Sequence, residues 1–242
     1  MILKLISHFY SKTAREQGDK RQLFVRNFLG SLSSGEKILD AGAGTQRYRP
    51  YSTHLNYLSQ DFCLYDGSYG GLNQSANWDV SNIDIVSDIT KIPVDDNSFD
   101  AIICTDVLEH VPRVYETCIE LRRIVRSGGK ICITVPTQCD LHQAPFFFSG
   151  GYSHFFFKEV FKEDDVRIIF ESGYYGTIDQ KIYLGFRYFV DYVKDGHNKI
   201  FNLILLLFYT LFSLPFVYLL RLFPSILNEI GNNGLFITIT KK

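Results

Sequence analysis

Short apolar runs alternate with amphipathic segments along the first half of this 242-residue chain. The runs are rich in Ile, Leu, Val and Tyr, and each is bounded by turn-forming or acidic residues, as in strands that are buried on both faces. We interpret them as strands at residues 36–40, 55–61, 83–89, 99–105 and 130–135. Residues 113–126 carry apolar side chains at helical spacing between the last two runs. Strands that alternate with helices predict an α/β fold with a doubly wound, mainly parallel sheet.

The first 31 residues show apolar positions at helical spacing and predict one or two helices ending at Gly30. Such a leader can cover a sheet edge or close over a ligand, and Tyr10 is the candidate for a ligand contact. The apolar stretch at the N-terminus is interrupted by Lys4 and His8, so we do not interpret it as a signal peptide.

The second half of the chain predicts three further elements. Residues 158–172 are amphipathic and predict a helix that Gly173 ends. Residues 174–183 are rich in Tyr, Ile and Thr and predict a sixth strand, and residues 234–240 predict the last one.

Residues 200–223 are almost wholly apolar, and Arg221 is the one ionisable residue among them. The length reaches the ~20 residues that cross a bilayer. Three interpretations remain: a helical pair, broken near Pro215, that packs on the sheet or on a second copy in a homodimer; a peripheral membrane anchor or re-entrant hairpin; or a true span. A single crossing would separate residues 234–240 from the sheet with which they must pair.

Acidic residues stand at matching positions in the pattern. Asp40, Asp61 and Asp88 each follow an apolar run, and Gly42 and Gly44 follow the first of these acids. Ligands of open α/β sheets bind at the carboxyl ends of the strands, where glycines let a ligand approach the main chain. Asp61 follows the glycine turn at about the ~20-residue interval of a ribose-binding acid.

Residues 36–136 resemble the core of class I S-adenosylmethionine-dependent methyltransferases, in the broad group that acts on small molecules and lipids. The matching motifs are Ile38–Thr45, Asp61, Ser87–Ile89 with Ile92–Pro93, Asn97–Asp100, Val107–Val111 and Arg123–Gly129. The resemblance implies a Rossmann-like, seven-stranded sheet whose last strand is antiparallel. We divide this single expected domain, residues 1–242, into a helical cap (1–31), a cofactor-binding core (36–136), an acceptor-pocket loop (137–157) and an apolar helical insertion before the last strand (184–232).

The resemblance also assigns the cofactor-binding residues. The turn at residues 40–45 would hold the methionine part, Asp61 the ribose, and Asp88 with Ile89 the adenine. Thr105 and Asp106 would line the place where methyl donor and acceptor meet. The expected cofactor-binding set is therefore Asp40, Gly42, Ala43, Gly44, Asp61, Asp88, Ile89, Thr105, Asp106 and Tyr10. Gln46 departs from the family pattern, which often has a third glycine there.

Aromatic residues crowd the stretch 142–157, after the fifth strand, where aromatic walls suit an apolar or flat acceptor. His142 and His154 could remove a proton from an acceptor hydroxyl, and His110 is a third candidate. The alternative for each histidine is a packing or hydrogen-bonding role. The sequence predicts no metal site.

The net charge and the cysteine content indicate which partners and which cellular compartment to expect. The net charge is −1, which gives no overall basic surface for nucleic acid. The five cysteines include no CxxC pair, as expected for reduced, buried thiols in a cytoplasmic protein.

Together these features predict a cytoplasmic methyltransferase, peripheral to the inner membrane, that acts on a small-molecule or lipid-like acceptor at oxygen. One alternative is an NAD-dependent oxidoreductase, but Arg47 stands where its G-x-G-x-x-G turn would need the last glycine. Another is a non-catalytic methyltransferase-like protein that docks on a membrane or a partner through residues 200–223. The intact acids and glycines of the turn argue against that alternative.

Overall fold

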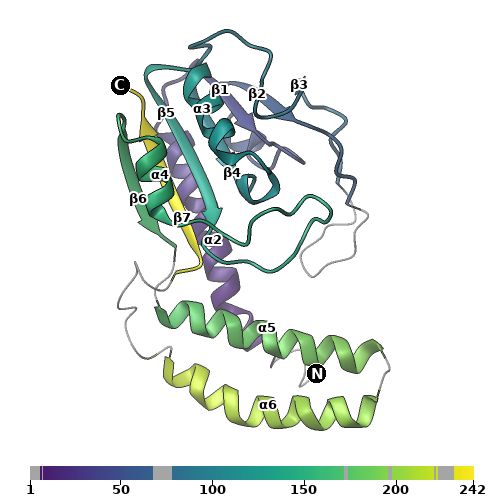
Figure 1. Cartoon of the computed structure of the whole chain (residues 1–242). Coiled ribbons are helices and arrows are strands. Elements are labelled where there is room, and N and C mark those ends of the chain that lie inside the picture. Colours follow the sequence, from purple (N-terminus) through teal and green to yellow (C-terminus); the bar gives the residue numbers. More distant parts are fainter. Residues whose placement is uncertain are drawn as a thin grey trace. The chain divides into compact units, whose positions relative to one another are not determined.

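The computed structural model describes residues 6, 8–67, 78–171, 174–195, 198–220, 222 and 232–242. These residues form two compact units (Figure 1). The sheet unit comprises Arg21–Ile169 and Gly234–Lys242, and the helical unit comprises residues 1–20 and 170–233. Helix α2 (Lys12–Gly30) contributes to both units, and the predicted helix end at Gly30 is confirmed.

The sheet has seven strands in the order β3-β2-β1-β4-β5-β7-β6. The strands are β1 (Lys37–Ala41), β2 (Asn56–Asp61), β3 (Ile85–Val86), β4 (Phe99–Thr105), β5 (Val125–Pro136), β6 (Asp165–Phe170) and β7 (Gly234–Thr240). Strands β1 to β5 pair in parallel, and Leu39 lies in register between Leu58 and Ile102. Strand β7 runs antiparallel to β5, with Ile133 opposite Ile237. The predicted seven-stranded sheet with an antiparallel last strand is confirmed.

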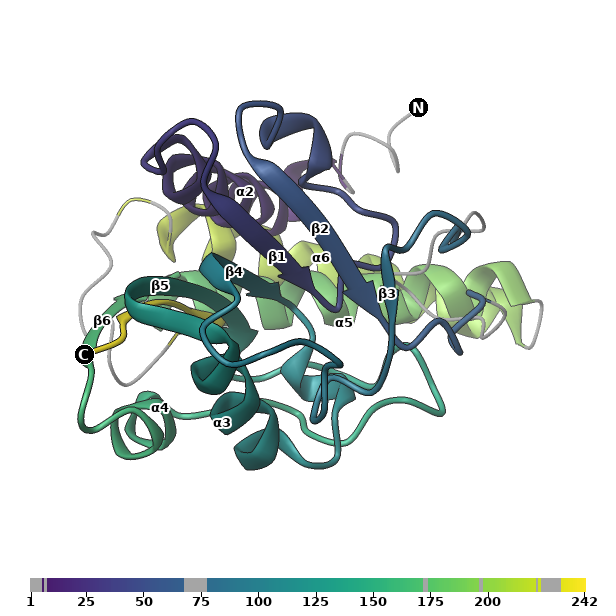
Figure 2. The ribbon, with the colours of Figure 1, turned by 90° about the horizontal axis from the view of Figure 1, so that it is seen from above.

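Helices cover both faces of the sheet (Figure 2). The C-terminal part of α2 packs on one face, where Val25, Phe28 and Leu29 join Ile38 and Ile103 in a buried cluster. Helices α3 (Val114–Ile124) and α4 (His154–Val160) lie on the other face. The short helices η1 (Arg49–Tyr51) and η2 (Leu108–His110) complete the sheet unit. Burial of apolar side chains on both faces explains why the strands read as continuous apolar runs.

The predictions for residues 158–183 are wrong in element type. The predicted helix at 158–172 is replaced by the end of α4 and by β6, and the predicted strand at 174–183 is the start of α5 (Tyr174–Asp195). In β6 the partly buried Val166 and Ile168 alternate with exposed residues, which is the period of a strand. Five apolar residues among charged ones fit both periods over so short a segment, so the pairing with β7 decides. In α5, packing in the helical unit overrides the preference of Tyr, Ile and Thr for strands.

The helical unit contains α5 and α6 (Lys199–Leu220), which lie side by side (Figure 1). The Tyr209 hydroxyl donates a hydrogen bond to the carbonyl oxygen of Ile182 at 2.7 Å. Its core is formed by Tyr10, Phe186, Leu206 and Val217. Helix α5 thus ends at Asp195, and α6 begins at Lys199, one residue before the predicted apolar segment.

The predicted break near Pro215 is wrong, because α6 continues through this residue to Leu220. Val217 and Leu220 are buried after the proline, so their packing holds the last turn in helical form. Proline in a helix removes one backbone hydrogen bond and can be accommodated by a kink. The predicted pair of helices exists, but it is formed by α5 and α6. Arg221 and Phe223 lie outside the described residues.

Within the part of the chain that the structure describes, one helix is long and apolar enough to cross a membrane. This helix is α6, which has 22 residues and contains an 18-residue window with a mean hydropathy of 2.3.

Candidate cofactor and acceptor site

Asp40 is the penultimate residue of β1. The residue is only 2% exposed, and the Tyr57 hydroxyl donates a hydrogen bond to its Oδ2 at 2.5 Å. Burial raises the pKa of Asp40 to about 7, against the lowering effect of the hydrogen bond from Tyr57. Asp40 therefore changes charge near neutral pH, which suits a group that faces a cationic ligand.

The turn after Asp40 requires glycine at two positions. Gly42 has φ +73°, and a Cβ atom there would lie 2.5 Å from Cγ2 of Val107. Gly44 has φ +49°, and a Cβ atom there would lie 2.8 Å from the Trp78 ring. Both residues take left-handed backbone angles and leave no room for a side chain. The turn is therefore closely packed against Val107 and Trp78, and it keeps its shape only with glycine at both positions.

Asp61 is oriented by the same turn. The backbone N–H of Gly44 donates to Oδ2, and that of Cys63 donates to Oδ1, both at 2.9 Å. Each carboxylate oxygen has a second lone pair, so Asp61 can still accept hydrogen bonds from two neighbouring hydroxyls. The arrangement fits the predicted ribose contact.

Gln46 takes the place of the third glycine of the family pattern, and its φ of 57° explains the preference for glycine. Its Nε2 donates to the carbonyl oxygen of Asn82 at 2.8 Å, and its Oε1 accepts from Arg49. Arg49 also forms an ion pair with Asp84 at 2.8 Å. These side-chain contacts tie the turn to the segment before β3 and compensate the strained backbone.

Asp88 and Ile89 follow β3. The Asp88 carboxylate accepts hydrogen bonds from Thr90 N and Oγ1, both at 2.8 Å, and pairs with Arg113 at 2.8 Å. The bond from the Thr90 backbone, followed by the other Thr90 and Arg113 contacts, lowers the pKa of Asp88 despite partial burial. Ile89 is buried beside it at 7% exposure. An ionised acceptor next to an apolar wall matches the predicted adenine contact.

Thr105 and Asp106 stand at the carboxyl end of β4. Asp106 has φ 55°, and its Oδ2 accepts a hydrogen bond from Arg21 at 2.7 Å. Thr134 in β5 donates to its Oδ1 at 3.1 Å. The left-handed backbone of a residue other than glycine is strained and is typical of functional positions.

The structure brings together two of the three candidate histidines. The rings of His110 and His142 meet edge to face with centroids 4.7 Å apart. Nδ1 of His110 lies 2.6 Å from the carbonyl oxygen of Phe146, and burial lowers the pKa of His110 to about 4. His154 begins α4, where its ring packs against Phe155 at 4.0 Å.

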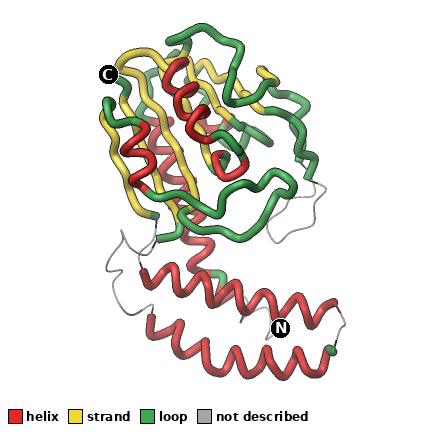
Figure 3. Tube along the Cα trace, in the orientation of Figure 1, coloured by secondary structure: helices red, strands yellow, loops and turns green. Residues whose placement is uncertain are grey.

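The segment between β5 and α4 forms a long loop over this end of the sheet (Figure 3). The backbone N–H groups of Phe148 and Ser149 donate to the carbonyl oxygen of Glu109 at 2.9 and 3.2 Å. Phe147 packs against His142 with ring centroids 5.1 Å apart, and Phe146 against Phe62 at 4.9 Å. The loop therefore places the Phe147 ring beside the histidine pair and the Phe146 ring against Phe62.

Three residues of this edge were not among the predicted site residues. Glu109 is 2% exposed, and burial raises its pKa to about 8, with a further contribution from Asp106. Phe62 and Trp78 bring aromatic rings from a polar loop in which isolated aromatic residues give no periodic signal. For Glu109 the sequence offers a signal, because the pair Glu109-His110 comes shortly after the end of β4.

Tyr10, the remaining predicted contact, belongs to the helical unit. Its ring stacks on Phe186 with centroids 4.6 Å apart, and its hydroxyl lies 2.6 Å from Ser213 Oγ. Its role in cofactor binding stays a prediction, as do the roles of the other predicted site residues.

The edge can bind a nucleoside that carries a cationic group. Asp61 offers a carboxylate that the Gly44 N–H orients for hydroxyls, and Asp40 is a buried carboxyl group on the neighbouring strand β1. S-adenosylmethionine has these features in one molecule, and the residues present fit it.

Comparison with known proteins agrees with this geometry. Residues 39–133 match the methyltransferase domain family. A demethylmenaquinone methyltransferase of Corynebacterium glutamicum is 34% identical over 103 residues, which are 42% of this chain and 42% of that protein. The probable tRNA methyltransferase 9B of Mus musculus is 29% identical over 114 residues, which are 46% of this chain and 24% of that protein. These matches thus span less than half the length of either relative.

Among solved structures, phosphoethanolamine N-methyltransferase 2 of Haemonchus contortus in complex with S-adenosyl-L-methionine has a TM-score of 0.51 at 14% identity. The similarity covers 92% of this chain and 52% of that one, and it supports the fold. The match of residues 39–133 to the methyltransferase domain family, the strand order and the glycine turn agree, and the fold is that of class I S-adenosylmethionine-dependent methyltransferases.

Proposed function

We propose that this protein transfers the methyl group of S-adenosylmethionine to an oxygen atom of a small, lipid-like acceptor at a membrane surface. The observation that carries the proposal is the aromatic loop over the histidine pair at the carboxyl edge of the sheet. The cofactor supplies an activated methyl group on sulfur, so the protein has to bind, align and exclude water.

The cofactor side of the site is assigned to the three strand-end acids. Asp61 would hold the ribose hydroxyls, Asp88 with Ile89 the adenine, and the turn above Asp40 the methionine part. Thr105 and Asp106 would border the acceptor. Because Gly44 and Asp61 are joined by a hydrogen bond, a shift of the turn would also displace the ribose contact.

The acceptor side favours an apolar or flat molecule. The Phe147 ring packs against His110 and His142, and the Phe146 ring of the same loop packs against Phe62; aromatic walls with a few polar groups are typical of such pockets. The name of the C. glutamicum relative refers to a quinone, which is an apolar ring of this kind. The net charge of −1 argues against a nucleic-acid acceptor, in spite of the tRNA methyltransferase relative.

A hydroxyl acceptor has to lose a proton as the methyl group arrives. A pKa of about 4 makes His110 a weak base at neutral pH, because an effective base titrates near the working pH. His142 is only half-buried, on the loop, and is the better candidate for proton removal. His154 remains a further candidate for this role.

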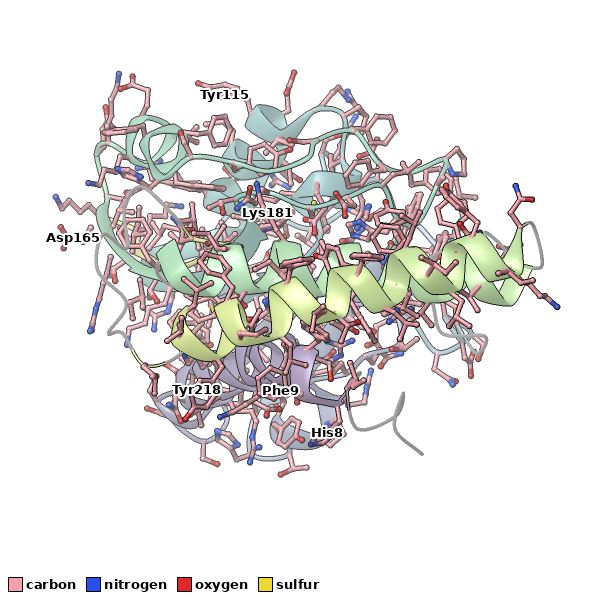
Figure 4. All side chains as sticks on the ribbon, turned by 90° about the horizontal axis from the view of Figure 1, so that it is seen from below. His8, Phe9, Tyr115, Asp165, Lys181 and Tyr218 are labelled. Atoms are coloured by element: carbon pink, nitrogen blue, oxygen red, sulfur yellow. The ribbon has the colours of Figure 1, made fainter. Side chains whose placement is uncertain are left out.

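The membrane part of the proposal concerns α6. Phe201, Leu207, Phe208, Leu211 and Phe212 are each at least 58% exposed. Residues 200–220 include no Asp, Glu, Lys or Arg, and side chains project along the whole length of the helix (Figure 4). Exposed apolar surface of this extent is typical of a lipid-facing segment. We propose a peripheral contact of a cytoplasmic protein with the inner membrane, through which an apolar acceptor would be reached.

The test is a search for the methylated product. The full-length protein is incubated with S-adenosylmethionine carrying a deuterated methyl group and with a membrane lipid extract, and the lipids are analysed by mass spectrometry. We expect one lipid-soluble product that carries the label as a methyl ether or ester. Asp61→Asn should abolish the label, whereas Asp95→Asn, in an exposed turn outside the site, should keep it. Label on nitrogen or carbon would contradict the oxygen acceptor, and label only in water-soluble products would contradict the lipid-like acceptor.

A further inference from the structure

Three side chains with metal-binding atoms lie close together at the carboxyl edge of the sheet. Glu109, His110 and His142 each offer one ligand atom, and these atoms all lie within 4.8 Å of one another. Glu109 and His110 come from η2, directly after β4, and His142 comes from the loop after β5. Residues far apart in the sequence are thus brought to one point by the fold.

Two of the ligand atoms are buried without a partner. Among the described residues, no hydrogen-bond partner is found for Oε2 of Glu109 or for Nε2 of His110. Buried polar atoms are almost always paired in native proteins, so two neighbouring exceptions require an explanation. Oε1 of Glu109 and Nε2 of His110 lie 3.9 Å apart, which is too long for a direct hydrogen bond.

The protonation of the histidines suits ligation. Nδ1 of His110 lies 2.6 Å from the carbonyl oxygen of Phe146, and that of His142 lies 2.8 Å from the carbonyl oxygen of Asp140. A carbonyl oxygen accepts only a protonated nitrogen, so in each neutral ring Nε2 carries the lone pair. Metal-bound histidines typically donate their second N–H to such an oxygen.

The local charge also favours a cation. Glu109 lies close enough to Asp106 for the two carboxyl groups to interact electrostatically. Arg21 lies nearby, but it forms its ion pair with Asp106 at 2.7 Å. A buried carboxyl group beside a second acid is stabilised in its ionised form by a bound cation.

We propose that Glu109, His110 and His142 bind one divalent first-row transition-metal ion. Two imidazole nitrogens and one carboxylate oxygen form a mixed set of the kind that binds Zn²⁺, Mn²⁺ or Fe²⁺ with coordination positions left open. Ligand bonds of ~2.0–2.2 Å require these atoms to draw closer than they lie here. Glu109 and His110 belong to the short helix η2, so we expect that His142 and its loop would move toward them when the ion binds.

The ion would have two consequences. It would fasten the loop at residues 137–153 to the sheet edge, because His142 is the ligand that the loop supplies. Its open positions would accept an oxygen atom of the methyl acceptor and lower the pKa of a bound hydroxyl, and His142, as a ligand, would then not act as the base. The second consequence rests on the proposed function, whereas the binding of the ion does not. The inference departs from the sequence analysis, in which no metal site was predicted.

The test uses Co²⁺ as a spectroscopic probe. The full-length protein is treated with a chelator, dialysed and titrated with Co²⁺ while the visible absorption is recorded. We expect one Co²⁺ per chain, with absorption bands of nitrogen and oxygen ligation and no thiolate band. Glu109→Gln and His142→Ala should each weaken Co²⁺ binding by at least about tenfold. His54→Ala is the matched control and should bind Co²⁺ as the wild type does, because His54 contacts the carbonyl oxygen of Leu29 outside the cluster.

The outcomes separate this inference from the proposed function. Circular dichroism and titration with S-adenosylhomocysteine check that each variant is folded and has an intact cofactor site. Wild-type protein that binds the cofactor product but no Co²⁺, or variants that keep full Co²⁺ affinity, would overturn the metal site and leave methyl transfer standing. Stoichiometric Co²⁺ binding without any methylated product would support the metal site and contradict the proposed function.

Discussion

At the scale of single residues, the site depends on groups whose environment changes their chemistry. Asp40 is a carboxyl group that burial keeps largely protonated up to neutral pH, with the Tyr57 hydroxyl as its hydrogen-bond donor. A cofactor with a positive charge would favour the ionised form. The same burial that prepares the site therefore costs stability in the absence of a ligand.

Substitution of Asp40 by Asn should remove this cost. Between pH 4 and pH 7 the unfolded chain loses the Asp40 proton and the folded chain keeps it, so the wild type loses stability as pH rises through this window. We expect the stability difference between Asp40→Asn and wild type to grow in favour of the variant by about 3 kcal/mol between pH 4.5 and 7.5. The measurement is urea unfolding of cofactor-free protein at several pH values. Parallel pH profiles for the two proteins would show that Asp40 has an ordinary pKa.

Gly42 allows a second prediction at this scale. Gly42→Ala adds a Cβ atom 2.5 Å from Val107 at φ +73°, and Gly35→Ala is its matched control, with φ +85° and nothing within 4 Å. Both variants should lose about 1 kcal/mol of stability through the left-handed backbone. Only Gly42→Ala should also move the turn and weaken binding of S-adenosylhomocysteine by at least about tenfold in calorimetry. Equal affinities in the two variants would contradict the close packing of the turn.

At the scale of elements, the buried strands were predictable because each contains a short apolar run bounded by turn-forming or acidic residues. Strands β1, β2 and β4 and helix α3 occur within a residue or two of the predicted bounds. The stretches 158–172 and 174–183 were assigned wrongly because neither is buried on all sides. The spacing of apolar residues in such stretches is ambiguous, and tertiary pairing decides between helix and strand.

The same distinction applies to the site. Asp40, Asp61 and Asp88 could be located from the sequence, since each follows a strand end and the topology brings strand ends together. The contact between His110 and His142 could not be predicted, because it depends on how a long loop returns to η2. The environment of Glu109 also depends on this loop, because the backbone N–H groups of Phe148 and Ser149 donate to the Glu109 carbonyl oxygen.

A buried ion pair joins α3 to the start of β6. Arg122 in α3 donates to Asp164 from Nε at 2.7 Å and from Nη2 at 3.1 Å, and the Asp164 side chain is fully buried. Arg122→Ala would leave this acid buried without its cation, and we expect a loss of about 3 kcal/mol in the free energy of unfolding.

The control for this prediction is an exposed ion pair of the same region. Lys162 and Glu159 are 65% and 76% exposed, so Lys162→Ala should unfold at the same urea concentration as the wild type. Equal unfolding midpoints for Arg122→Ala and wild type would show that the buried pair does not hold α3 to the start of β6.

At the scale of the whole molecule, the exposed apolar surface of α6 is the feature that a soluble methyltransferase domain does not require. We expect the protein to co-sediment with vesicles of phosphatidylcholine and phosphatidylglycerol. The triple variant Phe208→Ser, Leu211→Ser, Phe212→Ser should lower the partition coefficient by at least about tenfold, since each side chain buries apolar area in the bilayer.

A matched triple variant in the sheet unit provides the control. Leu23, Tyr115 and Ile119 are exposed apolar residues of α2 and α3, and their replacement by Ser should leave vesicle binding unchanged. Equal loss in both triple variants would point to unspecific hydrophobic adsorption, and no loss in either would exclude α6 as the membrane contact.

We infer that the carboxyl edge of the sheet binds S-adenosylmethionine. The most direct test of this binding is isothermal titration calorimetry of the full-length protein with S-adenosylhomocysteine and, separately, with NADH. We predict one S-adenosylhomocysteine per chain, affinity lowered by at least about tenfold in Asp61→Asn, and no heat from NADH. Binding of NADH without binding of S-adenosylhomocysteine would contradict the account.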